Sequence, residues 1–326
     1  MWKGARGILR KLFSGILALL ALLCCCGCSG DNPSEENEPF PVTVLGVTFN
    51  EPVESAVILS PSAAEMAVSF GLSSKVAAVS EECAQIEELA QLKTVGSEEK
   101  PDISAIIELS PDVVITRRSF SKSTLEQFNN AGIKALVIPN ATDMRELKSY
   151  YTAFATVFLG SEDASIQNKT LMEDAFFKIS ALQNVLNETK TSFLHLNSPS
   201  SLAQKGNFLS SLLSYIGSDV TASGEMDLNT AVQQNPTNVL IASPYTVENL
   251  AADPSMSALQ AVIEKRVYTL DISLFDRQSL SSVDAIYELA KQMYPEQADA
   301  LDAFVEEQKE SNMSESESSA EESTVS

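Results

Sequence analysis

The stretch "DISAIIELSPDVVI", residues 102–115, reads as a short helix, a turn and a buried strand in succession. Asp102 is a favourable N-cap, and the isoleucines that follow it share one helical face. Pro111 ends the helix, because the residue before a proline is displaced from the helical region of backbone conformation. The β-branched run at 113–115 is typical of a strand buried on both faces. The stretch therefore predicts a helix–turn–strand unit of an α/β fold.

The same unit returns 125 positions later as "DLNTAVQQNPTNVLI", residues 227–241. It keeps a capping Asp227, a breaking Pro236 at the same nine-residue spacing and an apolar strand at 239–241. Helices and strands alternate around each copy, which is the signature of a parallel sheet. We expect two related α/β lobes with a cleft between them; chance similarity of two short phrases is the alternative.

A long helical pattern lies between the two copies. After Gly160, apolar residues recur at spacings of three and four, and nothing breaks the pattern before about residue 187. Some 26 residues at 1.5 Å each reach ~39 Å, which is longer than one lobe is wide. We expect this helix to act as a rigid strut between the lobes.

The chain begins with a secretory signal. Residues 1–28 combine four basic residues with an apolar run at 12–23 that is too short to span a membrane comfortably. The segment ends in cysteines and resembles a bacterial lipoprotein signal, which implies lipidation of Cys28 behind Gly27, with Cys26 as the rival position. A plain signal peptide with a cysteine-rich end is the other interpretation.

Composition shifts divide the chain into six segments. They are a signal peptide, an acidic tether expected to be disordered, an N-terminal lobe, connecting helices that include the strut, a C-terminal lobe, and a disordered Ser/Glu-rich tail. Their boundaries are 1–27, 28–50, 51–142, 143–188, 189–308 and 309–326.

Charge and residue counts exclude several classes of function. The formal net charge of −22 disfavours nucleic-acid binding, which needs a basic surface. Only Cys83 is certain to remain in the mature domain, so a disulfide framework is not available. His195, the one histidine, falls within a strand and is expected to be packed, and a site for a bare transition metal would need more ligands.

Several phrases in order resemble one family. A strand followed by "SPSAAE", then "VGSEEKPDISAIIELSPDVVI", "NFLSSLLSYIG", "NPTNVLI" and "KRVYTLD" is similar to the substrate-binding lipoproteins of iron-siderophore, haem and cobalamin ABC importers. The resemblance covers residues 55–305. It implies two Rossmann-like parallel-sheet lobes joined by a rigid backbone helix, with a small-molecule ligand between them. It also implies a monomer, anchored by lipid to the extracytoplasmic face of the bacterial membrane, that delivers ligand to a permease with a cytoplasmic ATPase.

Ligands of open parallel sheets lie beyond the carboxyl ends of the strands. This rule selects loops that include 80–83 and 273–277. The expected ligand-binding residues are Ser62, Glu82, Ser97, Arg117 and Arg118 on the first lobe, and Asn197, Tyr245, Phe275 and Arg277 on the second. The adjacent arginines would suit an anionic ligand, or they pair with Glu98 and Glu99. The two aromatic residues either stack on a ring, or coordinate haem iron, or simply pack.

The expected docking surface departs from the family. By our alignment, the family's two permease-docking glutamates are replaced by Ser104 and Asn229, which cannot form ion pairs. Asp102 and Asp227 are placed symmetrically nearby, although N-capping explains them as well. Glu65 is a further docking candidate, with Glu99 and Glu225 as other acids. The S-x-x-E spacing of Ser62 and Glu65 instead predicts a capping box.

The sequence shows no enzyme signature. It lacks the Gly-x-Ser-x-Gly elbow, the His-Glu-x-x-His helix, the phosphate-binding Walker loop and the dinucleotide Gly-x-Gly-x-x-Gly turn. We therefore expect a binding protein with no catalytic residue, resident metal or cofactor. The alternatives are a surface sensor or adhesive lipoprotein that lost transport docking, and an extracytoplasmic chelatase-like enzyme.

Overall fold

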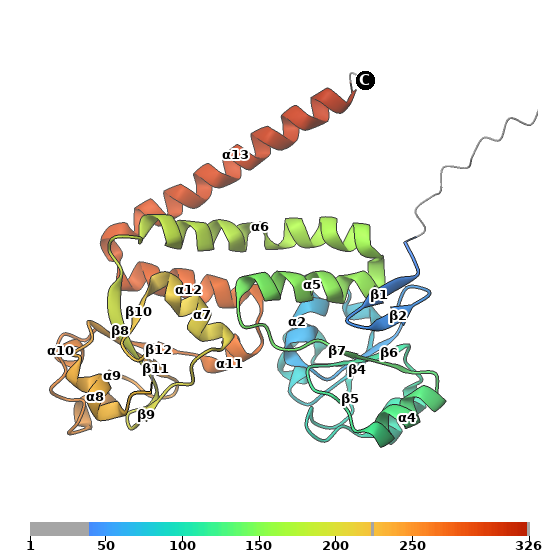
Figure 1. Cartoon of the computed structure of the whole chain (residues 1–326), viewed down its shortest axis with the longest axis horizontal. Helices are drawn as coiled ribbons and strands as arrows, with labels where there is room; N and C mark the ends of the chain where they lie inside the picture. Colours follow the sequence, from blue (N-terminus) through green and yellow to red (C-terminus); the bar gives the residue numbers. More distant parts are fainter. Residues whose placement is uncertain (1–38, 223–224, 325–326) are drawn as a thin grey trace, which may run out of the picture. The chain divides into compact units, whose positions relative to one another are not determined.

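The computed structural model describes residues 39–222 and 225–324 (Figure 1). Lobe one is built on a five-stranded parallel sheet in the order β5-β4-β3-β6-β7. Its strands are β3 (Ala56–Ile58), β4 (Val76–Val79), β5 (Lys93–Thr94), β6 (Val113–Thr116) and β7 (Lys134–Val137). Its helices are α2 (Pro61–Ser69), α3 (Ile103–Leu109) and α4 (Lys122–Asn130), with short 3-10 turns η1 (Ser73–Lys75), η2 (Cys83–Gln85) and η3 (Glu87–Leu89).

Lobe two is built on a second sheet in the order β10-β8-β11-β12, with β9 antiparallel to β8 at one end. Its strands are β8 (Thr191–Ser198), β9 (Ser201–Leu202), β10 (Gly217–Asp219), β11 (Asn238–Ala242) and β12 (Val267–Leu270). Its helices are α7 (Phe208–Ile216), α8 (Leu228–Gln233), α9 (Val247–Ala252), α10 (Gln260–Ile263) and α11 (Ile272–Asp276).

The repeated sequence unit is a repeated structural unit. In lobe one it forms α3 and β6, and in lobe two α8 and β11, and each strand lies in the interior of its sheet. The residue before the proline is left-handed in both copies, with φ 48° at Ser110 and 47° at Asn235. Both turns therefore leave the helix by the same backbone change, and the prediction of two related α/β lobes is confirmed.

Long helices join the lobes. They are α5 (Met144–Leu159), α6 (Ser161–Val185) and α12 (Leu280–Met293), followed by the turn η4 (Pro295–Gln297) and α13 (Ala298–Thr324). The predicted strut is α6, which packs against α5, α12 and α13 (Figure 1). Its 25 residues correspond to ~37 Å at the helical rise per residue.

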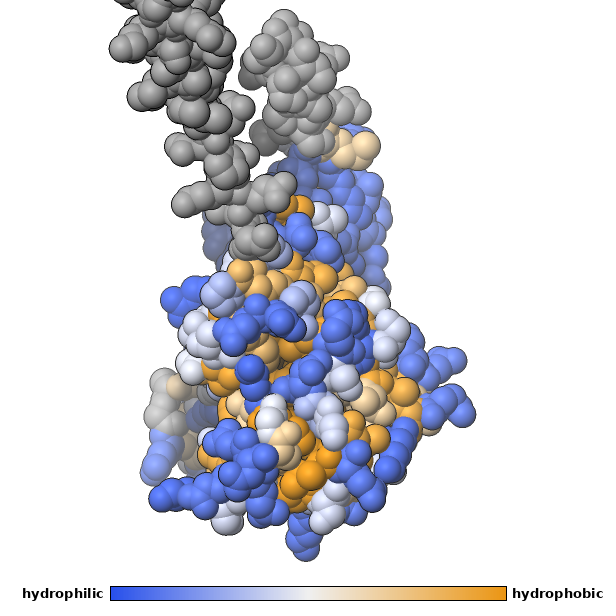
Figure 2. Space-filling model, turned by 90° about the vertical axis from the view of Figure 1, so that its right-hand side faces the viewer, coloured by the Kyte–Doolittle hydropathy of each residue, from blue (hydrophilic) through white to orange (hydrophobic). Residues whose placement is uncertain are grey.

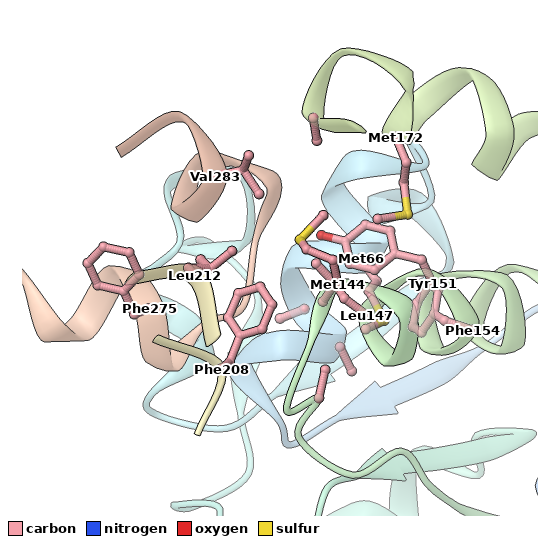
Figure 3. Close-up of a cluster of buried hydrophobic side chains, with 14 of the residues drawn as sticks. Met66, Met144, Leu147, Tyr151, Phe154, Met172, Phe208, Leu212, Phe275 and Val283 are labelled. Carbon is pink, nitrogen blue, oxygen red and sulfur yellow. The ribbon is translucent and has the colours of Figure 1, made fainter. Parts of the chain in front are cut away.

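A single hydrophobic core runs through both lobes. Figure 3 shows part of it, with Met66 of α2 and Tyr151 of α5 near Phe208 of α7 and Val283 of α12. Tyr151 and Phe208 have at most 2% of their surface exposed. Separate clusters cover the other face of each sheet. Because close-packed interiors resist deformation, the shared core holds the lobes at a set separation.

Two segments expected to be disordered are partly ordered. Within the predicted tether, β1 (Val42–Val44) and β2 (Val47–Phe49) form an antiparallel hairpin. Its apolar residues alternate with threonines and enter the core, while both turn residues, Leu45 and Gly46, have positive φ as a tight hairpin requires. The acidic composition of residues 28–50 suggests disorder, but the period-two pattern of residues 42–49 is that of a hairpin.

The predicted disordered tail is helical over most of its length. We expected order to end near residue 308, but α13 continues to Thr324. No proline or glycine interrupts residues 298–324, and Lys309 of α13 pairs with Asp174 of α6 at 3.0 Å. Nothing in this composition breaks a helix that has already begun on buried Leu301 and Val305.

Both hydrophobic and hydrophilic residues lie on the surface. Figure 2 views the molecule from its lobe-one side and shows hydrophobic residues in patches separated by hydrophilic ones. Among the described residues, no helix is both long enough and apolar enough to cross a membrane. The predicted signal peptide and the lipidation positions Cys28 and Cys26 lie outside the described residues.

Candidate ligand-binding site

A cavity of about 590 Å³ lies between the two lobes. Its walls come from loops and helix starts that follow β3, β4 and β6 in lobe one and β12 in lobe two. The lining residues are Pro61, Glu81, Glu82, Gln85, Arg117, Ser273, Asp276 and Arg277. Since parallel strands end at the same sheet edge, the carboxyl edges of both sheets contribute to one hollow.

Arg117 forms a two-pronged ion pair with Glu98. Its Nε donates to Oε1 at 2.8 Å, and its Nη2 lies 2.7 Å from Oε2. The Glu98 side chain is only 2% exposed, and burial raises its pKa against the opposing effect of Arg117. The backbone N–H of Glu98 donates to Glu82 Oε2 at 3.0 Å, which links the pair to the cavity wall.

Arg277 pairs with Glu65 across the lobes. Its Nη1 lies 3.5 Å from Glu65 Oε1, and burial raises the pKa of Glu65. The predicted capping box of Ser62 and Glu65 is wrong. The N-cap of α2 is Ser60, so Ser62 lies inside the first turn, and its Oγ is 2.8 Å from the Ser60 Oγ.

Two acids on the cavity wall have free carboxylates. Within the described part of the chain, the side chains of Glu81 and Asp276 form no hydrogen bond and no ion pair. Burial raises the pKa of Asp276, and the Arg117 charge opposes that effect from the facing lobe. These carboxylates can accept hydrogen bonds from a ligand that enters the cavity.

The structure brings together three of the nine expected ligand residues, Glu82, Arg117 and Arg277. Glu81, Ser273 and Asp276 fall in the loops that the strand-end rule selected, but we did not single them out. Pro61, at the start of α2, falls in another loop that this rule selects, residues 60–62. Gln85 lies too far beyond β4 for that rule to reach.

The other six expected residues lie elsewhere. Ser62 is buried, and Ser97 accepts a hydrogen bond from the Lys100 backbone at 3.2 Å. Arg118 pairs with Glu99 at 3.1 Å beside a second cavity of about 640 Å³ on lobe one. Asn197 is exposed at the end of β8.

The two expected aromatic residues serve as packing. Tyr245 packs on the hydrophobic cluster of lobe two, and Phe275 is buried in the shared core (Figure 3). Neither lines the inter-lobe cavity.

The docking candidates on the repeated units are helix caps. Asp102 accepts a hydrogen bond from the Ala105 backbone at 3.0 Å, and Asp227 accepts one from Thr230 at 2.8 Å. The capping role is confirmed in both lobes. Both carboxylates remain exposed, as is Asn229 on the first turn of α8.

The single histidine, His195, and the one cysteine of the described residues, Cys83, are buried. Burial lowers the pKa of His195 to about 4, and its Nε2 has no hydrogen-bond partner. Burial raises the pKa of Cys83 to about 12. No cluster of three potential metal ligands occurs among the described residues.

Comparison with known proteins places this architecture in a family. The sequence model of the periplasmic binding protein family matches residues 57–274. An uncharacterized ABC transporter substrate-binding lipoprotein, YvrC of Bacillus subtilis strain 168, is 23% identical over 306 residues, which cover 87% of this chain and 97% of the relative.

Solved structures share the fold at low identity. The vitamin B12 binding protein BtuF of Vibrio cholerae matches with a TM-score of 0.58 and 17% identity, over 79% of this chain and 98% of its own. CeuE of Helicobacter pylori, solved as a complex with Ni-His, matches with a TM-score of 0.62 and 18% identity, over 82% of this chain and 93% of its own. The chain belongs to the periplasmic binding protein family.

Proposed function

We propose that this chain is the lipid-anchored, extracytoplasmic solute-binding component of an ABC importer for a chelated-iron, haem or cobalamin-type ligand. The observation that supports it is the cavity between the lobes, which draws its walls from the carboxyl edges of both sheets. Its volume of about 590 Å³ falls in the range of small-molecule sites. The ligand is captured reversibly there and handed to a permease.

The arrangement of reactive groups supports binding over catalysis. The two arginines of the cavity are engaged by carboxylates, and the buried Cys83 thiol and His195 ring are absent from its lining. Covalent catalysis usually requires a nucleophile with an adjacent base, and the one hydroxyl among the described lining residues, that of Ser273, donates at 2.7 Å to the Asp271 carboxylate that caps α11. The shared core favours recognition by a preformed site.

The relatives support the ligand class and the anchor. The names of two structural neighbours include vitamin B12 and a nickel–histidine complex, both of which are metals held by an organic chelator. The Bacillus relative is named a lipoprotein, which supports lipidation at Cys28. In a chelate, the organic part supplies most of the metal ligands, so the protein needs none of its own.

Native mass spectrometry of residues 39–326 tests capture directly. The protein is offered ferric siderophores, haem and cobalamin together, and we expect a one-to-one mass shift for one of them. Gln85→Trp places a bulky indole in the cavity and should abolish the shift, whereas Gln127→Trp on the exposed face of α4 should leave it intact. No shift with any ligand, or a shift insensitive to Gln85→Trp, would contradict the proposal.

Docking through Asp102 and Asp227 is a separate proposal. Asparagine is as good an N-cap as aspartate, so Asp102→Asn with Asp227→Asn removes both charges and keeps both helices. We expect unchanged ligand binding and slower uptake into vesicles that contain the cognate permease. The neutral residues Ser104 and Asn229 favour a sensor as the second candidate, and ligand binding without any uptake would support it.

A further inference from the structure

The net charge that the inter-lobe cavity presents to a ligand depends on which of its charged side chains already form ion pairs. Two nitrogens of the Arg117 guanidinium contact the Glu98 carboxylate, whose side chain is 2% exposed. Arg277 faces Glu65, whose side chain is 15% exposed. Each arginine of the lining is therefore paired with a carboxylate whose side chain is largely buried.

Three acidic side chains of the described cavity lining form no ion pair. Glu81 and Asp276 form no side-chain ion pair within the described residues, and Glu82 forms hydrogen bonds with the Glu98 backbone and the Ser80 side chain but no ion pair. Two of these acids come from lobe one and one from lobe two, so the hollow is negative on both walls. Charges this close together act within one Debye length, and the protein walls focus their field into the opening.

An anionic ligand would meet a further obstacle. The Nε and Nη2 of Arg117 already contact Glu98, so an anion could reach only the Nη1 end of the guanidinium unless it displaced Glu98 and left a buried carboxylate without its partner. A cationic ligand needs no such rearrangement, because Glu81 and Asp276 are open acceptors. No aromatic side chain lines the described cavity, so the walls offer no stacking face for a flat macrocycle.

We propose that this cavity selects a positively charged metal chelate, one that presents an ammonium or similar donor group to Asp276, Glu81 and Glu82, and discriminates against anionic chelates. This rests on the proposed function, since it takes the cavity as the binding site. It reverses the expectation that Arg117 and Arg118 would attract an anion. Arg118 lies beside the second cavity and pairs with Glu99.

Three matched ferric trihydroxamates test the charge rule. They share one linear chelating backbone and differ only at its end, which is a free ammonium, an acetylated amine or a succinylated amine, giving net charges of +1, 0 and −1. Affinities for residues 39–326 are measured by titration calorimetry at low and high salt. We expect the cation to bind about ten-fold more tightly than the anion, and the ratio to shrink as salt screens the cavity.

Two variants test whether the preference for a cationic chelate arises from the cavity. Asp276→Asn should reduce the preference for the cation about three-fold, whereas Asp163→Asn, an exposed acid on α6 outside the cavity, should leave it unchanged. Equal or tighter binding of the anionic chelate, or a preference that Asp276→Asn does not reduce, would overturn the charge rule and leave the proposed function intact.

Failure to bind any trihydroxamate is resolved by the mixed panel used for native mass spectrometry. If haem or an anionic ferric catecholate binds there and Gln85→Trp abolishes it, the charge rule is wrong and capture stands. If a cationic member of the panel binds, the rule is supported. If nothing in the panel binds, both proposals fall.

Discussion

The Glu65 carboxylate of α2 lies 3.5 Å from the Arg277 guanidinium that follows α11, so an acid of lobe one is paired with a base of lobe two. Arg277 also lines the inter-lobe cavity, and the Glu65 side chain is only 15% exposed. Glu65 therefore contributes to an inter-lobe ion pair rather than to the cap of its own helix. Our docking proposal accordingly rests on Asp102 and Asp227.

Removal of the Glu65 charge should weaken the fold modestly. Glu65→Gln leaves Arg277 without its carboxylate, and because both groups are partly solvated we expect a loss of about 1 kcal/mol in the free energy of unfolding. Urea denaturation measures it. Glu126→Gln, which breaks the exposed pair with Lys122, is the matched control and should change stability by less than about 0.5 kcal/mol. Equal effects in the two variants would show that the inter-lobe pair has no special role.

A second inter-lobe contact should matter more. The side-chain amide of Gln278 donates to the Ala141 carbonyl and accepts from the Ala141 N–H, both at 2.8 Å, and the contact is buried. Gln278→Ala strands both backbone groups, so we expect a loss of roughly 2–4 kcal/mol. Gln127→Ala, at an exposed position on α4, serves as the control in the same urea experiment. A loss below about 1 kcal/mol would mean that water or a local shift satisfies the Ala141 backbone.

Acid should destabilise the protein through His195. In the unfolded chain its pKa is near the ordinary value of 6.5, and in the folded protein burial lowers it to about 4. Below pH 6.5 the unfolded chain therefore gains a proton that the folded protein excludes. Stability from this group is complete above pH 6.5 and falls by ~3 kcal/mol as the pH approaches 4.

His195→Leu should remove that part of the acid dependence. The chain has a single histidine, so the difference between wild type and variant isolates this one group. Urea denaturation between pH 7 and pH 4 measures it, and the gap in the free energy of unfolding should widen steadily toward pH 4. Parallel pH profiles for the two proteins would contradict the burial of a neutral ring.

The Cys83 thiol should be inert in the folded state. It is fully buried, burial raises its pKa to about 12, and the Ser80 hydroxyl lies 3.2 Å from its Sγ. Because the thiolate is the reactive form, we expect negligible labelling of residues 39–326 by Ellman's reagent at pH 8. Complete labelling should follow in denaturing guanidinium chloride. Labelling of the native protein within seconds would show that the site opens readily.

Local pattern predicted the elements well and some of their contacts poorly. The helix–turn–strand units around Pro111 and Pro236 and the helical strut were visible in sequence because propensity, capping and apolar spacing are properties of neighbouring residues. For Glu65, the local pattern predicted the wrong contact. Its spacing from Ser62 matches a capping box, but the helix begins at Pro61, and the partner that Glu65 finds is more than 200 positions away.

The sequence by itself determined two α/β lobes, the strut between them and the strand ends where ligand residues belong. Only the tertiary structure decided which of those strand-end residues meet, because that depends on how a shared core sets one sheet edge against the other. The tertiary structure also decided the sign of the charge that the cavity presents to a ligand. Whether Arg117 and Arg277 act as free cations depends on carboxylates that folding brings beside them, and Glu98 and Glu65 occupy those places.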